Sequence, residues 1–266
     1  MKKFLQNYRN FKVFTVLVAV LLAVALIVVV RLVMVLLENA EADRGYRDLR
    51  QFAPDDVYME QYIDSGPEQL IYEPQGKEYD DDEEDPEPPP GMILEPGPEL
   101  ADINENYAGW IRIEGTPVDY PMVQSDNVKY LNTTFWGSHN RAGTIFLDER
   151  NTGQFNGTFV VAYGHNSRSG GMFGSLRDFA RVEHKVHHPD ITIFTRNGEV
   201  LTYRIIAAFA TTINDDLYAL FDADEETKVN YFMTHGAHSY STNFLALSTC
   251  IVSNSDDDRF LVLAAR

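Results

Sequence analysis

The feature that most constrains this chain of 266 residues is a long apolar run close to its N-terminus. Residues 13–30 carry no charge and are almost wholly apolar, and after Arg31 the apolar pattern continues as far as Leu37. About 20 apolar residues are enough to cross the hydrocarbon core of a bilayer. The guanidinium of Arg31 would reach the polar interface, because its long stem can lie along apolar surface. We therefore predict a transmembrane anchor over residues 13–37.

The charges on either side of this run predict its orientation. Residues 1–12 carry only basic charges, whereas acidic residues follow soon after the run, at Glu38, Glu41 and Asp43. Because basic flanks stay in the cytoplasm, we expect residues 1–12 to be cytoplasmic and the chain beyond the anchor to be extracellular. The alternative is a cleaved signal peptide. The run is longer than a typical signal-peptide core, and no clean A-x-A cleavage site follows it.

The acidic residues are concentrated directly after the predicted anchor. The chain has 22 Lys and Arg against 40 Asp and Glu, a net charge of −18, which argues against a nucleic acid as partner. Half of the acidic residues lie in residues 38–99, where prolines are also frequent. Such a segment has too little apolar surface to fold, and its charges repel one another. We expect residues 38–99 to form an extracellular stalk, whose first few turns could continue the membrane helix.

From about residue 100 the pattern changes to short apolar runs between turn residues. These runs are rich in Val, Ile, Thr, Tyr and Phe, as strands are. The eight candidate strands are residues 110–115, 118–124, 144–149, 158–165, 191–196, 199–212, 244–250 and 259–265. Two helices are predicted, at residues 172–179 and 223–238, the second capped by Asp222 or Asp224. Many short strands with few helices predict a mainly β domain, a closed or nearly closed barrel, over residues 100–266.

The chain has a single cysteine, Cys250, at the end of the predicted strand 244–250. Exported proteins usually use cysteines in pairs, and a lone cysteine cannot form an internal disulfide. Two interpretations remain open. Cys250 is either a small buried apolar side chain, as most free cysteines are, or a nucleophile whose thiolate needs a nearby base or cation.

Two further residues are candidates for that base and cation. His165 follows the apolar run 158–162 in a glycine-flanked turn, from which it could reach a cleft. Arg259 opens the strand after that of Cys250, and neighbouring strands would bring the guanidinium and the thiol together. The alternatives are a loop histidine with no special role and a surface arginine that offsets the acidic residues 256–258. The histidines lack the spacing of a zinc site, so we expect no metal.

These motifs together are similar to those of a known family. The set YGHN (163–166), LSTC (247–250) and Arg259, downstream of an N-terminal anchor, resembles the sortases, the cysteine transpeptidases of Gram-positive cell surfaces. The resemblance covers about residues 102–266 and points to class B. The stretches that carry the class B likeness are residues 108–137, 143–151 and 163–176, together with the helix before the final pair of strands.

The resemblance implies a fold, an activity and roles for particular residues. It implies an eight-stranded barrel with a few flanking helices, in which Cys250 attacks a sorting signal, His165 moves protons and Arg259 stabilises the oxyanion. Ser248 and Thr249 would line the cleft. Substrate contacts of Asn127 and Leu131 are implied more weakly. No metal or organic cofactor is expected.

The implied partners are secreted proteins that carry a C-terminal sorting signal. The signal would be cleaved after its threonine, and the acceptor would be an amino group of a peptidoglycan precursor or of a pilin. Two departures from the family pattern leave the recognised motif open. Ala246 stands where the family often has Thr, and Ile251 stands where class B members often have an acidic residue.

Four other functions are alternatives to an anchoring sortase. A pilin-polymerising sortase of class C is disfavoured because no C-terminal membrane span and no evident lid segment are found in the sequence. An L,D-transpeptidase would need S-x-G-C with an arginine directly after it, and a papain-like protease would need its cysteine before its histidine. A membrane-anchored binding module without activity would be favoured if Cys250, His165 or Arg259 were absent.

Overall fold

The computed structural model describes residues 2–54, 97–167, 170–251 and 257–266. The chain divides into two compact units, Met1–Gly45 and Tyr46–Arg266. Most of the predicted stalk, residues 55–96, lies outside the described part of the chain.

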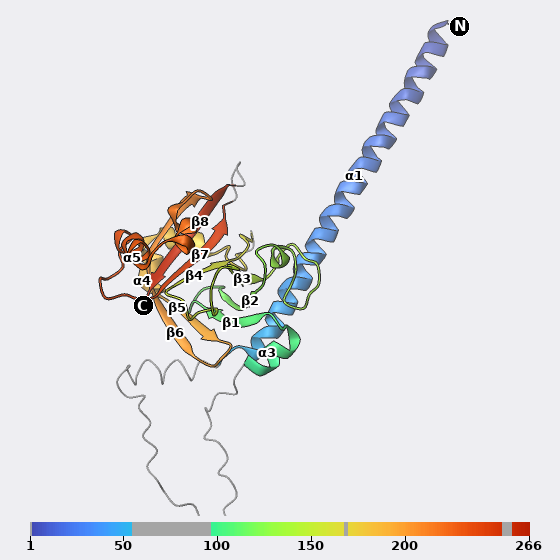
Figure 1. Cartoon of the computed structure of the whole chain (residues 1–266). Coiled ribbons are helices and arrows are strands. Elements are labelled where there is room, and N and C mark those ends of the chain that lie inside the picture. The colour runs from blue at the N-terminus through green and yellow to red at the C-terminus, as the bar shows by residue number, and fades with distance from the viewer. Residues whose placement is uncertain (1, 55–96, 168–169, 252–256) are drawn as a thin grey trace, which may run out of the picture. The chain divides into compact units, whose positions relative to one another are not determined.

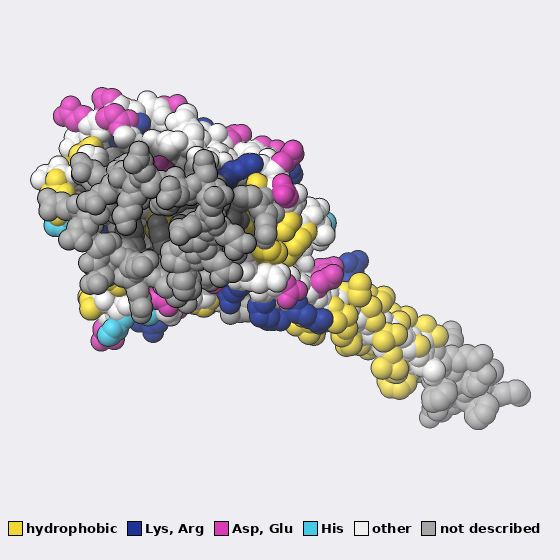
Figure 2. Space-filling model, turned by 90° about the horizontal axis from the view of Figure 1, so that it is seen from below, with side chains coloured by type: hydrophobic (Ala, Val, Ile, Leu, Met, Phe, Trp, Pro, Cys, Tyr) yellow, Lys and Arg dark blue, Asp and Glu magenta, His cyan; other side chains and the backbone are white. Residues whose placement is uncertain are grey.

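The first unit consists of most of helix α1 (Lys2–Leu49). Figure 2 shows hydrophobic side chains over the surface of this helix, and those from Phe14 to Leu37 are mostly exposed. By length and composition the segment Phe14–Phe52 could cross a membrane, with a mean hydropathy of 3.2 in its most apolar window. The helix also continues for several turns past the apolar run, as the sequence predicted.

The second unit is a closed barrel of eight strands (Figure 1), which confirms the predicted fold class. The strands are β1 (Tyr107–Arg112), β2 (Asp119–Gln124), β3 (Ile145–Leu147), β4 (Phe159–Tyr163), β5 (Asp190–Thr195), β6 (Val200–Thr212), β7 (Phe244–Cys250) and β8 (Asp258–Ala265). They close in the order β1-β2-β3-β4-β7-β8-β6-β5. Most neighbours are antiparallel, but β2 runs parallel to β3 and β4 runs parallel to β7.

Side chains alternate between the two faces of the barrel wall, because successive residues of a strand point in opposite directions. One set of apolar residues belongs to the main core: Val160, Ala162, Leu245, Leu247, Phe260 and Val262. The residues between them belong to a second core: Phe159, Val161, Phe244, Ala246, Leu261 and Leu263. This second core is covered by two segments of the β6–β7 connection, the 3₁₀ helix η4 (Asp216–Asp222) and helix α5 (Glu225–Thr234).

The helix predicted at residues 172–179 differs in the structure. A 3₁₀ helix, η3 (Leu176–Ala180), forms in its place and is followed by the α-helix α4 (Val182–His187). Met172, the first residue of the predicted helix, has a φ of 51°, in the left-handed region, which excludes this residue from a right-handed helix. The sequence pattern did not predict η4 or α4.

The helix predicted at residues 223–238 is shorter than expected. Helix α5 begins after Asp224, whose carboxylate accepts a hydrogen bond from the backbone N–H of Thr227, so Asp224 rather than Asp222 is the N-cap. The helix ends at Thr234, and Gly236 follows with a φ of 105°. Glycine adopts this conformation readily and commonly ends helices in this way.

Three short helices complete the described part of the chain: η1 (Arg50–Phe52), α3 (Gly97–Ile103) and η2 (Lys129–Leu131). The residues around η1 are tied to the barrel within the second unit. Tyr46 donates a hydrogen bond to the carbonyl of Gly143, and its ring packs edge-on against Tyr120. These contacts make the end of α1 part of the barrel core.

Replacement of Gly109 by alanine tests the closure of the barrel between β1 and β5. A Cβ atom at this position would lie 2.5 Å from the backbone oxygen of Phe194. We expect Gly109→Ala to lower the free energy of unfolding by about 1–3 kcal/mol, the usual cost of overpacking a core. Gly157→Ala is the control, because its nearest neighbour would be an ordinary contact at 3.6 Å. Denaturant titration of the full chain in detergent measures both, and equal stability of the two variants would contradict this packing.

Candidate active site

The ends of β7 and β8 bring Cys250 and Arg259 opposite each other. The two residues are partners in the antiparallel register. The N–H of Ile251 donates to the carbonyl of Asp258 at 3.2 Å, which makes that pair hydrogen-bonded and the Cys250–Arg259 pair non-hydrogen-bonded. Partners of the second kind have Cα atoms about 4.5 Å apart and the closest side chains in a sheet. The structure therefore places thiol and guanidinium side by side, as the sequence predicted.

His165 comes to the same level from the other side of β7. Strand β4 runs parallel to β7, with Tyr163 beside Ser248. The N–H of Gly164 donates to the carbonyl of Ser248 at 3.2 Å, so the pairing continues past the end of β4. His165 lies two residues beyond Tyr163, and Cys250 lies two residues beyond Ser248.

Alternation assigns the three candidates to one face of the barrel wall. Val161 in β4, Ala246 in β7 and Leu261 in β8 all belong to the second core, the one that η4 and α5 cover. Counting in steps of two from these residues leads to His165, Cys250 and Arg259. The register thus brings the three positions to one edge of the second core, and the described hydrogen bond of the His165 ring goes to Leu131 on the β2–β3 connection.

The exposure of Cys250 decides between its two interpretations. The thiol is free and exposed, so Cys250 is not a small buried apolar side chain. Beside it, the guanidinium of Arg259 donates to the carbonyl of Asp258 at 3.0 Å. The acidic residue 256, which could offset this arginine, lies outside the described residues. Cys250 thus presents a reachable thiol on the strand position opposite a permanent cation.

The imidazole of His165 is oriented by the loop that carries η2. Its Nε2 atom is hydrogen-bonded to the backbone carbonyl of Leu131. A carbonyl can only accept, so Nε2 carries a hydrogen and Nδ1 is the basic nitrogen of the neutral ring. Leu131 was predicted as a substrate contact; its side chain is 38% exposed and its carbonyl fixes the candidate base.

The other predicted substrate contacts fall in different places. Asn127 is partly buried, and its side-chain oxygen accepts from the N–H of Glu149 at 2.9 Å. Ser248 is buried on the face of Cys250, where its hydroxyl meets that of Tyr218 at 2.9 Å. Thr249 is also buried, and alternation turns it to the opposite face, with Leu247. The side chain of Thr249 is therefore not brought together with Cys250.

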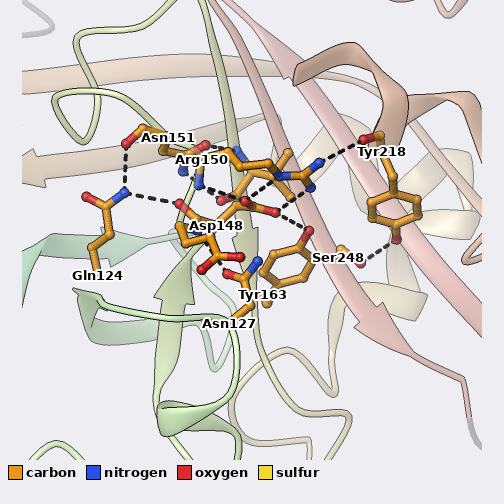
Figure 3. A network of polar contacts seen from close by, with 10 residues as sticks. Gln124, Asn127, Asp148, Arg150, Asn151, Tyr163, Tyr218 and Ser248 are labelled. Atoms are coloured by element: carbon orange, nitrogen blue, oxygen red, sulfur yellow. Dashed lines mark hydrogen bonds and ion pairs between the residues drawn. The ribbon is translucent and has the colours of Figure 1, made fainter. Parts of the chain in front are cut away.

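A buried polar network beside these residues was not predicted from the sequence. It centres on Asp148, which is fully buried and accepts hydrogen bonds from Arg150 and from the hydroxyl of Tyr163 (Figure 3). Burial raises the pKa of Asp148, but the hydrogen bonds from Arg150 and Tyr163 together hold it below its usual value. Burial, followed by the hydrogen bond to Asp148, raises the pKa of Tyr163, so this phenol stays protonated. The sequence feature that could have indicated this network is an acidic residue, Asp148, directly after the apolar residues of a strand.

Among the described residues, no group of three or more His, Cys, Asp or Glu side chains is arranged to hold a metal ion. The groups that this site offers for chemistry are a thiol, an imidazole and a guanidinium. Together they can attack a carbonyl, transfer a proton and stabilise a developing oxyanion.

Comparison with known proteins agrees with this geometry. The Sortase domain family matches residues 111–266, more than half of the chain. Sortase B of Listeria monocytogenes is 32% identical over 164 residues, which are 57% of this chain and 65% of that protein. The chain therefore spans just under two thirds of the length of this relative.

Two solved structures are similar to the barrel. Sortase B of Clostridium perfringens is 27% identical with a TM-score of 0.56, over 63% of this chain and 97% of that one. A class B sortase of Streptococcus pyogenes, described as involved in pilus biogenesis, is 30% identical with a TM-score of 0.56, over 63% of this chain and 95% of that one. The family match, the relatives and the barrel agree: this chain belongs to the sortase family and is class B-like.

Proposed function

We propose that this protein is a membrane-anchored cysteine transpeptidase that cleaves a C-terminal sorting signal after its threonine and transfers the new carboxyl end to an amino group. The observation that carries this proposal is the register of β4, β7 and β8, which brings His165, Cys250 and Arg259 to one level and one face. Membership of the sortase family supports the same chemistry.

In the first half of the reaction, the Sγ atom of Cys250 passes its proton to His165 and attacks the carbonyl carbon of the threonine. Negative charge develops on the carbonyl oxygen, where N–H groups of Arg259 donate hydrogen bonds. As the amide C–N bond breaks, His165 gives a proton to the leaving amine. The product is a thioester between Cys250 and the cargo protein.

In the second half, the acceptor amine attacks the thioester carbonyl and gives its proton to His165. A new amide C–N bond forms, the C–S bond breaks and the sulfur of Cys250 leaves as a thiolate. His165 returns this proton to the sulfur, and the enzyme is back in its starting state. The chemistry needs no metal or organic cofactor.

The proposed location follows from the apolar helix. Residues 13–37 anchor the protein in the cell membrane as a single span, with residues 1–12 in the cytoplasm. Residues 38–99 and the catalytic domain, residues 100–266, then lie outside the cell, and Tyr46 and Leu49 of the predicted stalk pack in the barrel core instead of being solvated. The candidate span over Phe14–Phe52 supports this arrangement.

The acceptor amine has two sources of different chemistry. We propose an amino group of a peptidoglycan precursor, which would attach the cargo protein to the cell wall. Transfer to a pilin amine is the second candidate, favoured by the 30% identity to the Streptococcus pyogenes sortase described as involved in pilus biogenesis. A third reading, a catalytically idle binding module, predicts no thioester with any sorting signal.

Formation of the thioester is the direct test of the nucleophile. The full chain in detergent is mixed with peptides of the LPxTG, NPxTx and PPxTG types, and its intact mass is measured. We expect a mass gain equal to the N-terminal part of one peptide, because the thiol keeps the acyl group and releases the amine. Cys250→Ala is the control and should gain nothing. Folded protein with a free thiol that forms no adduct with any of these peptides would contradict the proposal.

Replacement of Arg259 by lysine tests the oxyanion role. Lysine keeps the charge but lacks the planar fork of N–H donors. We expect kcat/KM for peptide cleavage to fall about 10²–10³-fold, the usual cost of losing an oxyanion donor. The control is Arg204→Lys, since Arg204 forms an exposed ion pair with Asp190 on β6 and β5. Equal activity of Arg259→Lys and Arg204→Lys would contradict the role of Arg259.

A further inference from the structure

Asp148 gathers four hydrogen bonds on a buried carboxylate. Its Oδ1 atom accepts from the backbone N–H and from Nε of Arg150, each at 2.9 Å. Its Oδ2 atom accepts from Nη2 of Arg150 at 2.9 Å and from the hydroxyl of Tyr163 at 2.7 Å. Asp148 directly follows β3, and none of its surface is exposed. Such a carboxylate is stable only while its donors stay in place.

One arm of this network leads to the strand of His165. Tyr163 is the last residue of β4, and His165 follows it by two residues. The hydroxyl of Tyr163 is held by Asp148, and its ring packs against Phe146 in β3, with centroids 5.4 Å apart. The carboxylate therefore fixes the point from which the chain turns toward the candidate base.

The second arm leads to the strand of Cys250. Nη1 of Arg150 donates to the backbone carbonyl of Tyr218 at 3.2 Å, and its guanidinium lies 4.0 Å from the centre of the Phe221 ring. Both residues belong to η4. The hydroxyl of Tyr218 then meets that of Ser248 at 2.9 Å, two residues before Cys250 (Figure 3). The carboxylate therefore also fixes η4 against the end of β7.

We infer that Asp148 is a positioning residue for acyl transfer, which holds the β4 end of His165, the β7 end of Cys250 and the intervening segment η4 in one arrangement. This inference rests on the proposed function. It gives Asp148, the first of two acidic residues at the end of the predicted strand 144–149, a role in the reaction, although its side chain is buried and touches neither His165 nor Cys250 in any described contact.

The network has the properties that such a role needs. The bidentate pairing of Arg150 with Asp148 is directional, because a planar guanidinium matches a carboxylate in one geometry. Arg150 is itself 40% exposed on its side chain, so the arm to η4 crosses from the buried carboxylate to the surface. Displacement of reacting groups by about 1 Å can lower a rate about 10²-fold. Small shifts of Tyr163 and Tyr218 would therefore displace the ends of β4 and β7, which carry His165 and Cys250.

Asp148→Asn is the first variant of the test, in the full chain in detergent. It keeps the size of the side chain, but its amide nitrogen would face a donor where the carboxylate accepted. Asp119→Asn is the matched control. Asp119 also accepts from an arginine Nε and an aromatic N–H, from Arg112 at 3.0 Å and from Trp110 at 2.8 Å. Asp119 lies at the start of β2. Asp148 directly follows β3, which pairs with the other end of β2.

Two readouts separate positioning from stability. The first is the split between kcat and KM for cleavage of whichever LPxTG-, NPxTx- or PPxTG-type peptide the wild type accepts. We expect Asp148→Asn to lower kcat about 10²-fold with little change in KM. The second is the pH profile of Cys250 alkylation by iodoacetamide, which should shift in Asp148→Asn. In Asp119→Asn both readouts should match the wild type. This should hold even if the midpoint of thermal unfolding of Asp119→Asn falls as far as that of Asp148→Asn.

Arg150→Lys keeps the test decisive if Asp148→Asn does not fold. Lysine retains a cation beside Asp148 but lacks the planar fork whose separate nitrogens bond both carboxylate oxygens and the carbonyl of Tyr218, so kcat should again fall. The inference would be overturned if folded Asp148→Asn or Arg150→Lys kept the wild-type kcat and the wild-type alkylation profile, or if Asp119→Asn lost as much kcat. Either result would leave the proposed function standing. A wild type that cleaves no peptide would instead overturn the proposed function, and the inference with it.

Discussion

The site depends on the pairing of β7 with a parallel neighbour, β4, on one side and an antiparallel neighbour, β8, on the other. Each pairing has one register, and together they decide which residues stand level with Cys250. A slip of one residue in either pairing would turn Arg259 or His165 to the opposite face of the wall, because side chains alternate. These strands are buried on both faces, so such a slip is costly. It would turn the side chains of the main core toward the second core, and those of the second core toward the main core.

The two cores have different roles in this arrangement. The main core fills the barrel and fixes the strands. The second core lies under η4 and α5, and it ends where β7 reaches Ser248, leaving Cys250 exposed one step further on. The buried carboxylate of Asp148 lies at this boundary, where apolar packing gives way to polar contacts. The β6–β7 connection is thus both the cover of the second core and a wall beside the thiol.

Much of the fold was legible in the sequence, because local pattern and tertiary structure agree there. All eight strands formed where alternation and β-branched residues predicted them, and Asp224 capped its helix. The helix predicted at residues 172–179 was wrong, since apolar spacing does not reveal the left-handed backbone of Met172. Thr249 shows a related limit, because proximity to Cys250 in a motif does not reveal the face of a strand. The contact of Arg150 with Tyr218 joins residues 68 positions apart, and only the folded barrel brings them together.

The central claim is that the pairing of β4 with β7 brings His165 beside Cys250. A cross-linking measurement tests this claim most directly. The only native cysteine is Cys250, so His165→Cys creates a chain with two thiols. Neighbouring strand positions that face the same way have the separation a disulfide needs. Under mild oxidation we predict an internal disulfide, seen in the intact mass of the monomer as the loss of two hydrogens. Free thiols in His165→Cys, together with a disulfide in Asn166→Cys, would show that the register differs by one residue and would contradict the account.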